Sequence, residues 1–190
     1  MQLRHLPNLI SAGRLATIPV LLWLAARGWQ DAFAWLLLAA GASDLLDGWL
    51  ARRFGWVSRF GAMLDSIADV ALTLTAIAGL WIFHRDTLAA YWPYIAAICL
   101  TWLVVHAVAL IRYRRLASFH TRLTQMGLFG FGLFVLLVFF HGFVPWFFYL
   151  VALLCVLAGI ENLVMIMLLA NWTPNRRGGL LALLRSRRAT

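Results

Sequence analysis

Four aspartates within 26 residues are the side chains of this sequence best suited to chemistry. Two residues separate Asp44 from Asp47 and three separate Asp65 from Asp69, and all four lie in otherwise apolar segments. An ionised carboxylate in or near a bilayer is costly unless it is paired or hydrated. The cluster therefore requires cations, and oxygen ligands of this kind favour Mg²⁺ or Mn²⁺ over softer metals.

Helices would position these carboxylates well. Residues three or four apart are neighbours on a helix, so each pair would lie on one face. Two antiparallel helices with such faces opposed would form a cage of four carboxylates. Two divalent ions in that cage would suit a displacement at phosphorus, because they stabilise both the attacking and the leaving oxygen. A phosphate could approach the backbone at Gly48 and Gly61, and Arg52 could hold it.

Two other interpretations of the carboxylates stay open. A buried salt-bridge network could neutralise the first pair, although three arginines do not easily neutralise four close carboxylates. Its cations would be Arg52, Arg53 or Arg59. A proton or cation relay through the membrane would need ionisable groups along a whole path. The half of the predicted protein that faces away from the cytoplasm has almost none.

The composition is that of an integral membrane protein and excludes an ordinary soluble domain. The 190 residues are 64% hydrophobic and only 12% charged, against roughly 25% charged in soluble domains. A helix of about 20 apolar residues crosses a bilayer, and six such segments are found at 8–26, 32–52, 60–83, 88–111, 123–140 and 144–169. We therefore predict an all-α, polytopic membrane protein with six transmembrane helices in a single domain, 1–190.

The arginines set the predicted orientation. All 16 basic residues are arginine, and if the N-terminus is cytoplasmic only Arg27 and Arg85 fall on the outer side. That is a strong positive-inside bias. An even number of spans then places both termini in the cytoplasm, with 171–190 as a cytoplasmic tail. We expect a multi-pass protein of the cell's inner (cytoplasmic) membrane, with its active site facing the cytoplasm.

The acidic motif has the spacing of a known signature. The pattern is D-x2-D-G-x2-A-R-x8-G-x3-D-x3-D, and its eight fixed positions are Asp44, Asp47, Gly48, Ala51, Arg52, Gly61, Asp65 and Asp69. It resembles the signature of the CDP-alcohol phosphatidyltransferase family, whose six-segment layout is also similar. The opening, 6–11 with Arg14 and Pro19, is similar to the start of the phosphatidylglycerophosphate synthase and cardiolipin synthase branches.

This resemblance implies a reaction and a set of roles. An alcohol attacks the β-phosphorus of CDP-diacylglycerol, CMP leaves, and a phosphodiester forms. The implied ligands of two Mg²⁺ or Mn²⁺ ions are Asp44, Asp47, Asp65 and Asp69. Asp69 is also the implied general base, because a carboxylate within reach can take the proton of the acceptor hydroxyl. The residues implied to line the CDP site are Gly48, Ala51, Arg52, Gly61 and Asn8.

The acceptor alcohol is less strongly indicated. Arg112 and Arg122 bound a cation-rich stretch, which either binds a phosphate on the acceptor or anchors the chain at lipid headgroups. Family members that use glycerol phosphate usually carry lysines there and a proline after the third aspartate, where this sequence has Ser66. Glu161, deep in the last apolar segment, either pairs with a polar neighbour or shapes the acceptor pocket.

The leading hypothesis is an enzyme of phospholipid biosynthesis, a metal-dependent phosphatidyltransferase that makes phosphatidylglycerophosphate from CDP-diacylglycerol and glycerol 3-phosphate. Transfer to phosphatidylglycerol, as in a cardiolipin synthase, or to inositol phosphate, serine or another alcohol stays open. So does a non-catalytic membrane binding protein or a cation transporter. The expected partners are the two substrates and the lipid bilayer. A homodimer would be ordinary for such a family, and no nucleic acid is expected.

Overall fold

The computed structural model describes residues 6–54, 59–114 and 121–169, which form helices joined by short turns. The side chains of 6–8, 44–54, 59–60 and 62 lie outside that description. The helices are α1 (Leu6–Ala26), α2 (Gln30–Phe54), α3 (Arg59–Ala89), α4 (Trp92–Tyr113), α5 (Arg122–His141) and α6 (Pro145–Leu168). They belong to two compact units, 1–88 and 89–190.

Most of these helices have the character of membrane spans. In the described part of the chain, α1, α3, α4, α5 and α6 are long and apolar enough to cross a bilayer. The remaining helix, α2, contains the first aspartate pair and two arginines near its end. The predicted all-α, multi-pass membrane class is therefore confirmed. A sixth span, the orientation of the termini and the single domain stay predictions.

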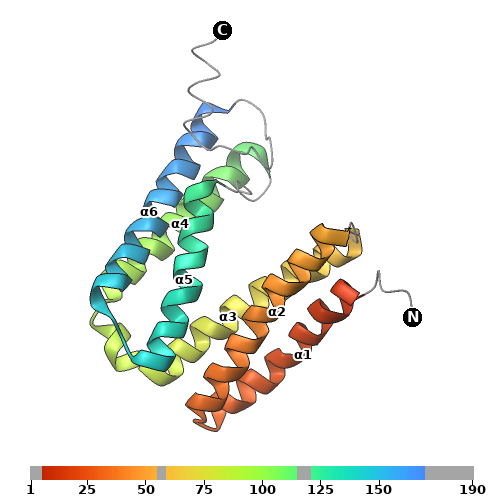
Figure 1. The fold of residues 1–190 in the computed structure, drawn as a ribbon. Coiled ribbons are helices and arrows are strands. Elements are labelled where there is room, and N and C mark those ends of the chain that lie inside the picture. The colour runs from red at the N-terminus through yellow and green to blue at the C-terminus, as the bar shows by residue number, and fades with distance from the viewer. Residues whose placement is uncertain (1–5, 55–58, 115–120, 170–190) are drawn as a thin grey trace. The chain divides into compact units, whose positions relative to one another are not determined.

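In the first unit, α1 and α2 form an antiparallel hairpin (Figure 1). Gly28 follows α1 with a φ of +72°, a conformation that glycine adopts without a Cβ clash. The Gly28 N–H donates to the Ala25 carbonyl at 3.1 Å, and the Trp29 N–H donates to the Leu24 carbonyl at 3.0 Å. These two bonds satisfy carbonyls at the end of α1. The buried side chains of the hairpin include Leu21, Leu24, Ala25, Phe33, Ala34, Leu37 and Ala40.

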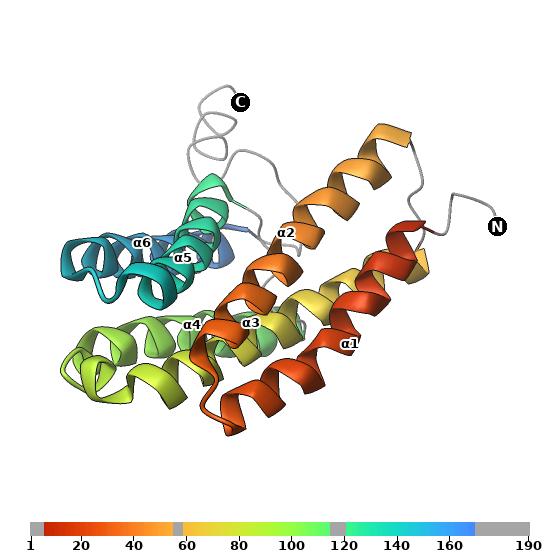
Figure 2. The same cartoon turned by 60° about the horizontal axis from the view of Figure 1, so that its bottom comes forward.

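The absence of a side chain at Gly79 on α3 leaves room for the ring of Phe33 on α2. The Phe33 ring is fully buried, and it occupies the space that a Cβ at Gly79 would need. Its centroid lies 5.6 Å from that of Phe83. The contact ties the first turn of α2 to the later turns of α3. Figure 2 shows that α1 starts, α2 ends and α3 starts toward the opposite end of this unit.

The third helix extends further than the sequence predicts. The predicted segment ends at 83, but α3 only bends at His84 (φ −129°, ψ 23°) and continues to Ala89. The next helix accordingly begins at Trp92 instead of 88. Pro93 follows directly, and the fixed φ of proline suits the first turn of a helix. The polar residues after 83 thus mark a kink, while the proline marks the start of α4.

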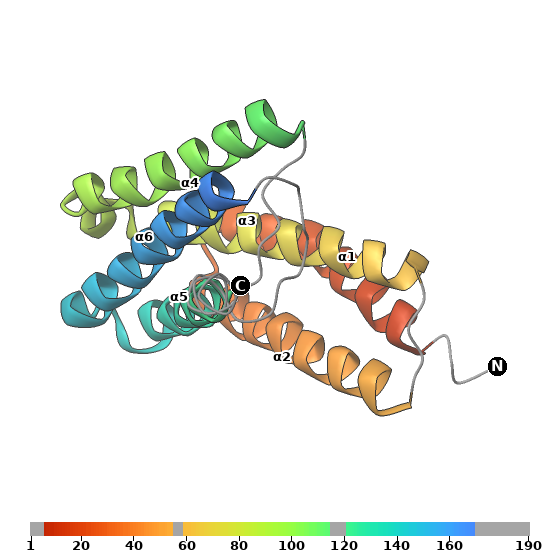
Figure 3. The same cartoon turned by 90° about the horizontal axis from the view of Figure 1, so that it is seen from above.

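In the second unit, α6 packs against both α4 and α5, and it runs between them in Figure 3. The contact with α4 is an apolar cluster of Val105, Ala109, Met165, Ile166 and Leu169. On the α5 side, Cβ atoms at Gly127 and Gly130 would touch α6 at 3.4 to 3.6 Å. Small residues at such positions allow membrane helices to approach closely.

Candidate active site

Asp65 and Asp69, near the start of α3, share one cationic partner on α1. The Arg14 guanidinium donates from Nη1 to Asp69 Oδ1 at 2.7 Å. The same nitrogen lies 3.4 Å from Asp65 Oδ1. Because one nitrogen reaches both carboxylates, the two side chains lie on the same face of α3, as their spacing predicts.

The three side chains differ sharply in exposure. The Arg14 side chain is 0% exposed, whereas those of Asp65 and Asp69 are 41% and 49% exposed. A buried charge is tolerated when an opposite charge and hydrogen bonds compensate it. The ion pair therefore explains how α1 accommodates an arginine. The half-exposed carboxylates remain accessible to a cation or a substrate.

Sequence reasoning misses Arg14 as a site residue. It treats this arginine only as one of the cytoplasmic cations and as part of the opening that resembles the family. The usable signal is its position inside the apolar span Leu9–Ala26, because a charged residue there pairs with another polar group. The sequence does not reveal the partners, which lie 51 and 55 residues further along the chain.

The backbone brings the other two aspartates to the same end of the first unit. Asp44 and Asp47 lie in the second half of α2, which ends toward the same end of the unit as the starts of α1 and α3 (Figure 2). Their side chains lie outside the described residues, as do those of Arg52, Arg53 and Arg59. Among the described side chains no group of three His, Cys, Asp or Glu could hold a metal. The four-carboxylate cage and the alternative salt-bridge network both stay predictions.

The predicted CDP-binding residues are placed by their helices. The last turns of α2 contain Gly48, Ala51 and Arg52, and the first turn of α1 contains Asn8. Their side chains lie outside the described part of the structure. Gly61 is the third residue of α3 and is half-buried. All five positions thus fall at the end of the unit that holds the acidic motif, and their roles stay predictions.

One predicted acceptor residue, Arg112, has a structural contact in the second unit. It donates from Nη2 to the Leu169 carbonyl at 3.2 Å. The neighbouring Tyr113 hydroxyl lies 2.8 Å and 2.7 Å from the carbonyl oxygens of Ile166 and Leu169. Carbonyls at a helix C-terminus lack partners within the helix. The end of α4 therefore stabilises the end of α6.

The other predicted acceptor residue, Arg122, is exposed at the start of α5. Thr121 caps this helix, because its Oγ1 accepts a hydrogen bond from the Thr124 N–H at 3.1 Å. The N-terminus of a helix carries partial positive charge. The guanidinium and the helix end thus both favour an anion, and the acceptor role of the two arginines stays a prediction.

Polar residues deeper in the second unit link its helices. Asn162 donates from Nδ2 to Thr124 Oγ1 at 3.4 Å, which joins α6 to α5. His106 Nδ1 lies 2.9 Å from the carbonyl of Trp102 in its own helix. Glu161 is half-buried beside Asn162. Pairing or pocket-shaping by Glu161 stays a prediction.

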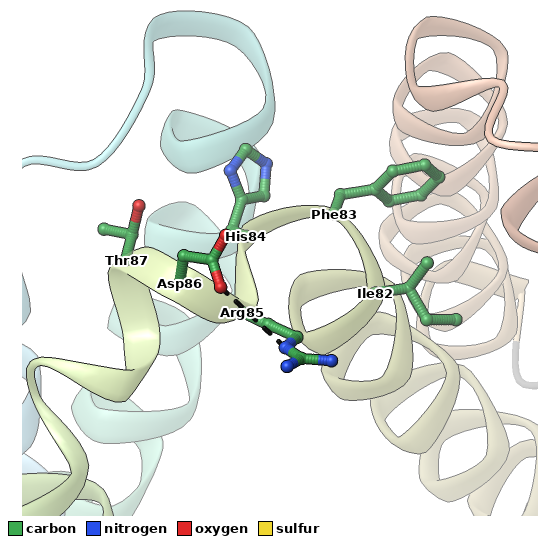
Figure 4. A pocket seen from close by; sticks show the side chains of 6 residues that line it. All are labelled: Ile82, Phe83, His84, Arg85, Asp86 and Thr87. Atoms are coloured by element: carbon green, nitrogen blue, oxygen red, sulfur yellow. Dashed lines mark ion pairs between the residues drawn. The ribbon is translucent and has the colours of Figure 1, made fainter.

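A surface depression of about 440 Å³ lies at the kink of α3, far from the acidic motif (Figure 4). It is lined by Ile82, Phe83, His84, Arg85, Asp86 and Thr87. Arg85 Nε and Asp86 Oδ1 lie 3.8 Å apart, and both side chains are well exposed, so this ion pair contributes little to stability. His84 follows Asp69 by 15 residues, or roughly 22 Å along a helix. The depression is therefore separate from the candidate active site.

Three relatives are similar to parts of the chain. It is 51% identical over 69 residues to CDP-diacylglycerol--glycerol-3-phosphate 3-phosphatidyltransferase 1, chloroplastic, of Oryza sativa subsp. japonica, covering 36% of this chain and 21% of the relative. Over 81 residues it is 42% identical to cardiolipin synthase (CMP-forming) of Streptomyces coelicolor, covering 40% and 38%. It is 41% identical over 76 residues to CDP-diacylglycerol--glycerol-3-phosphate 3-phosphatidyltransferase of Cereibacter sphaeroides, covering 38% and 34%.

These alignments each span well under half of the relative concerned. No solved structure matches the chain. A family-wide comparison covers far more of it, because residues 4–173 match CDP-alcohol phosphatidyltransferase. That range includes the acidic motif, Arg14 and all six helices. The chain belongs to the CDP-alcohol phosphatidyltransferase family.

Proposed function

We propose that this protein transfers a phosphatidyl group from CDP-diacylglycerol to glycerol 3-phosphate, forming phosphatidylglycerophosphate and CMP. The observation that carries the proposal is the pairing of Asp65 and Asp69 on one half-exposed face of α3, inside the complete acidic signature of its family. Relatives from Oryza sativa and Cereibacter sphaeroides that are named for this reaction support the choice of acceptor.

The donor set suits a hard divalent cation. Asp65 and Asp69 offer carboxylate oxygens at the end of the first unit where α2 carries Asp44 and Asp47, and such oxygens favour Mg²⁺ or Mn²⁺. We propose that these four aspartates hold two ions. When bound, the ions would supply positive charge to the phosphates of the donor and to the leaving oxygen.

The chain's own residues would then carry out binding and proton transfer. We propose that Asp69 accepts the proton of the acceptor hydroxyl as its oxygen bonds to the β-phosphorus. The bond between that phosphorus and the CMP oxygen breaks, and CMP leaves with the electron pair. Gly48, Ala51, Arg52, Gly61 and Asn8 would bind the CDP group. Arg112 and Arg122 would bind the phosphate of the acceptor, as guanidinium groups readily do.

The proposed setting is a bacterial-type inner membrane. Six helices would span it, with both termini and the tail 171–190 in the cytoplasm and the acidic motif facing the same side. The five apolar helices and the positive-inside arginines support this arrangement. The donor's acyl chains would stay in the bilayer while its CDP group reaches the site. We include a homodimer in this proposal, because a homodimer is ordinary for such a family.

Transfer to phosphatidylglycerol is the second candidate reaction. The Streptomyces coelicolor relative is named cardiolipin synthase (CMP-forming), and the stretch 112–122 lacks lysine. The lipid product separates the two candidates. Purified protein in detergent, with CDP-diacylglycerol and Mg²⁺, should yield phosphatidylglycerophosphate from glycerol 3-phosphate, identified by mass spectrometry. Cardiolipin from phosphatidylglycerol, with no product from glycerol 3-phosphate, would replace the leading proposal.

The same assay would use inositol phosphate, inositol and serine as further acceptors. A product with only one of them would redefine the substrate within the same family. A protein that binds CDP-diacylglycerol but releases no CMP with any acceptor would act as a binding protein or transporter. Because a transporter forms no phosphodiester, CMP release separates that class of function from a transferase.

A further inference from the structure

Arg14 links α1 to the two carboxylates of α3, a contact that the proposed reaction does not use. Its side chain is fully buried, and its Nη1 lies 2.7 Å from Asp69 and 3.4 Å from Asp65. The contact is specific, because the two hydrogen bonds leave the same nitrogen for two residues one helical turn apart. Thr17 Oγ1 donates to the Arg14 carbonyl at 2.7 Å and takes no part in the ion pair.

The charges of this arrangement have a consequence for a site that binds cations. Two carboxylates on adjacent turns repel each other when neither is neutralised. A guanidinium that bridges them removes that repulsion without any metal. It also places a positive charge beside the oxygens that a divalent ion would need, so the ion and the guanidinium oppose each other electrostatically.

We propose that Arg14 is a built-in counter-charge of the acidic site. It holds Asp65 and Asp69 together when no divalent ion is bound, and it weakens the affinity of the site for that ion. Arg14 is thus a positioning residue that acts through the two aspartates. This inference rests on the proposed metal site. It adds that α1 supplies a charge that sets metal affinity and the stability of the metal-free protein.

Two measurements on folded protein in detergent test this role. One is the midpoint of thermal unfolding in EDTA and in saturating Mg²⁺, and the other is the dissociation constant for Mn²⁺ measured by electron paramagnetic resonance. The variants are Arg14→Gln, which removes the charge, and Arg14→Lys, which keeps it. The matched control is Arg27→Gln, because Arg27 follows the same helix and its guanidinium lies about 6 Å from the Trp23 and Trp29 rings.

The expected result is a metal-dependent defect. In EDTA, Arg14→Gln should unfold about 5 °C or more below the wild type, the order of shift that loss of a buried ion pair gives. In saturating Mg²⁺ the difference in unfolding midpoint between Arg14→Gln and the wild type should be smaller, because the ion replaces the missing positive charge. The Mn²⁺ dissociation constant should fall roughly tenfold, since one repelling charge is gone. Arg14→Lys should lie near the wild type in both measurements, and Arg27→Gln should match it.

Other outcomes would overturn the inference. If Arg14→Gln unfolds below the wild type by the same amount in EDTA and in Mg²⁺, and its Mn²⁺ affinity is unchanged, Arg14 is a packing residue only. Weaker Mn²⁺ binding would mean that Arg14 supports the ion instead of opposing it. If Arg14→Gln can be purified folded only in the presence of Mg²⁺, the inference is supported. If it fails to fold with and without Mg²⁺, the ion does not replace Arg14 and the inference is wrong.

The wild type separates this inference from the proposed function. Suppose that the wild type binds Mn²⁺ and is stabilised by Mg²⁺, and that Arg14→Gln differs from it by the same amount with and without metal. The proposed metal site then stands, and only the role of Arg14 is removed. Wild-type protein that binds neither ion would remove the metal site itself, and with it the counter-charge. A double-mutant cycle in EDTA adds a metal-free check: Arg14→Gln should cost less stability in an Asp69→Asn background, because the main partner charge is absent.

Discussion

The Asp69 carboxylate on α3 lies 2.7 Å from the Arg14 guanidinium on α1, and the arginine is buried while the aspartate is half exposed. Arg14 therefore holds the Asp69 carboxylate on the side that faces the protein, while the other side of this carboxylate stays accessible. A residue in this position is held in place and still reachable. Both properties suit the proposed role of Asp69, in which its carboxylate accepts a proton from an incoming hydroxyl.

Replacement of Asp69 tests its role as base. Asp69→Asn should lower turnover by roughly 10²–10⁴-fold, because an amide of the same shape cannot accept the proton. Folding should be retained, since Asn still offers an oxygen to Arg14. The measurement is CMP release, with thermal unfolding and gel filtration as checks of folding. Asp86→Asn is the matched control, because Asp86 is an exposed carboxylate of the same helix near its kink. Near-normal turnover in Asp69→Asn would remove Asp69 as the base.

Arg122 is expected to act on the acceptor. Arg122→Ala should raise the KM for glycerol 3-phosphate by roughly tenfold, because a charge-assisted contact to phosphate is lost. The KM for CDP-diacylglycerol should change little. Steady-state kinetics with each substrate varied in turn gives both values. Equal increases for the two substrates would identify Arg122 as a general anchor at the membrane surface.

The contact between the ends of α4 and α6 should matter for stability. Tyr113→Phe removes the hydroxyl that lies 2.8 Å and 2.7 Å from the carbonyls of Ile166 and Leu169, at and just beyond the end of α6. Loss of this hydrogen bonding should lower the free energy of unfolding by about 1–2 kcal/mol. The dissociation constant for CDP-diacylglycerol should stay unchanged. Thermal unfolding in detergent and a lipid-binding titration measure these effects. An unaltered unfolding midpoint would show that the hydroxyl contributes nothing measurable.

The contact of the Phe33 ring with Gly79 leads to a further prediction. Gly79→Ala should lower the free energy of unfolding by about 1–3 kcal/mol, because the new methyl group overlaps the buried Phe33 ring. Gly132→Ala is the matched control in α5, since nothing lies within 4 Å of its new Cβ. It should have little effect or stabilise the helix slightly. Equal unfolding midpoints for the two variants would contradict the packing of Phe33 against Gly79.

Local patterns in the sequence predict much of this fold. Each of the six predicted segments corresponds to a helix, and the spacing of Asp65 and Asp69 correctly placed them on one face. The predicted end of the third helix was wrong, because polar residues after 83 permit a kink as readily as the end of a helix. The partnership of Arg14 and the contact of Phe33 with Gly79 were not predictable, since each depends on how separate helices pack.

The most direct measurement of the proposed function is CMP release from CDP-diacylglycerol by the purified wild-type protein. It should be run with glycerol 3-phosphate in Mg²⁺, in Mn²⁺ and in excess EDTA, with Asp69→Asn alongside. The proposal predicts CMP and phosphatidylglycerophosphate in equal amounts with either ion, and almost none in EDTA or from the variant. Undiminished release in EDTA, or none from folded wild type with any acceptor, would contradict a metal-dependent phosphatidyltransferase at this site.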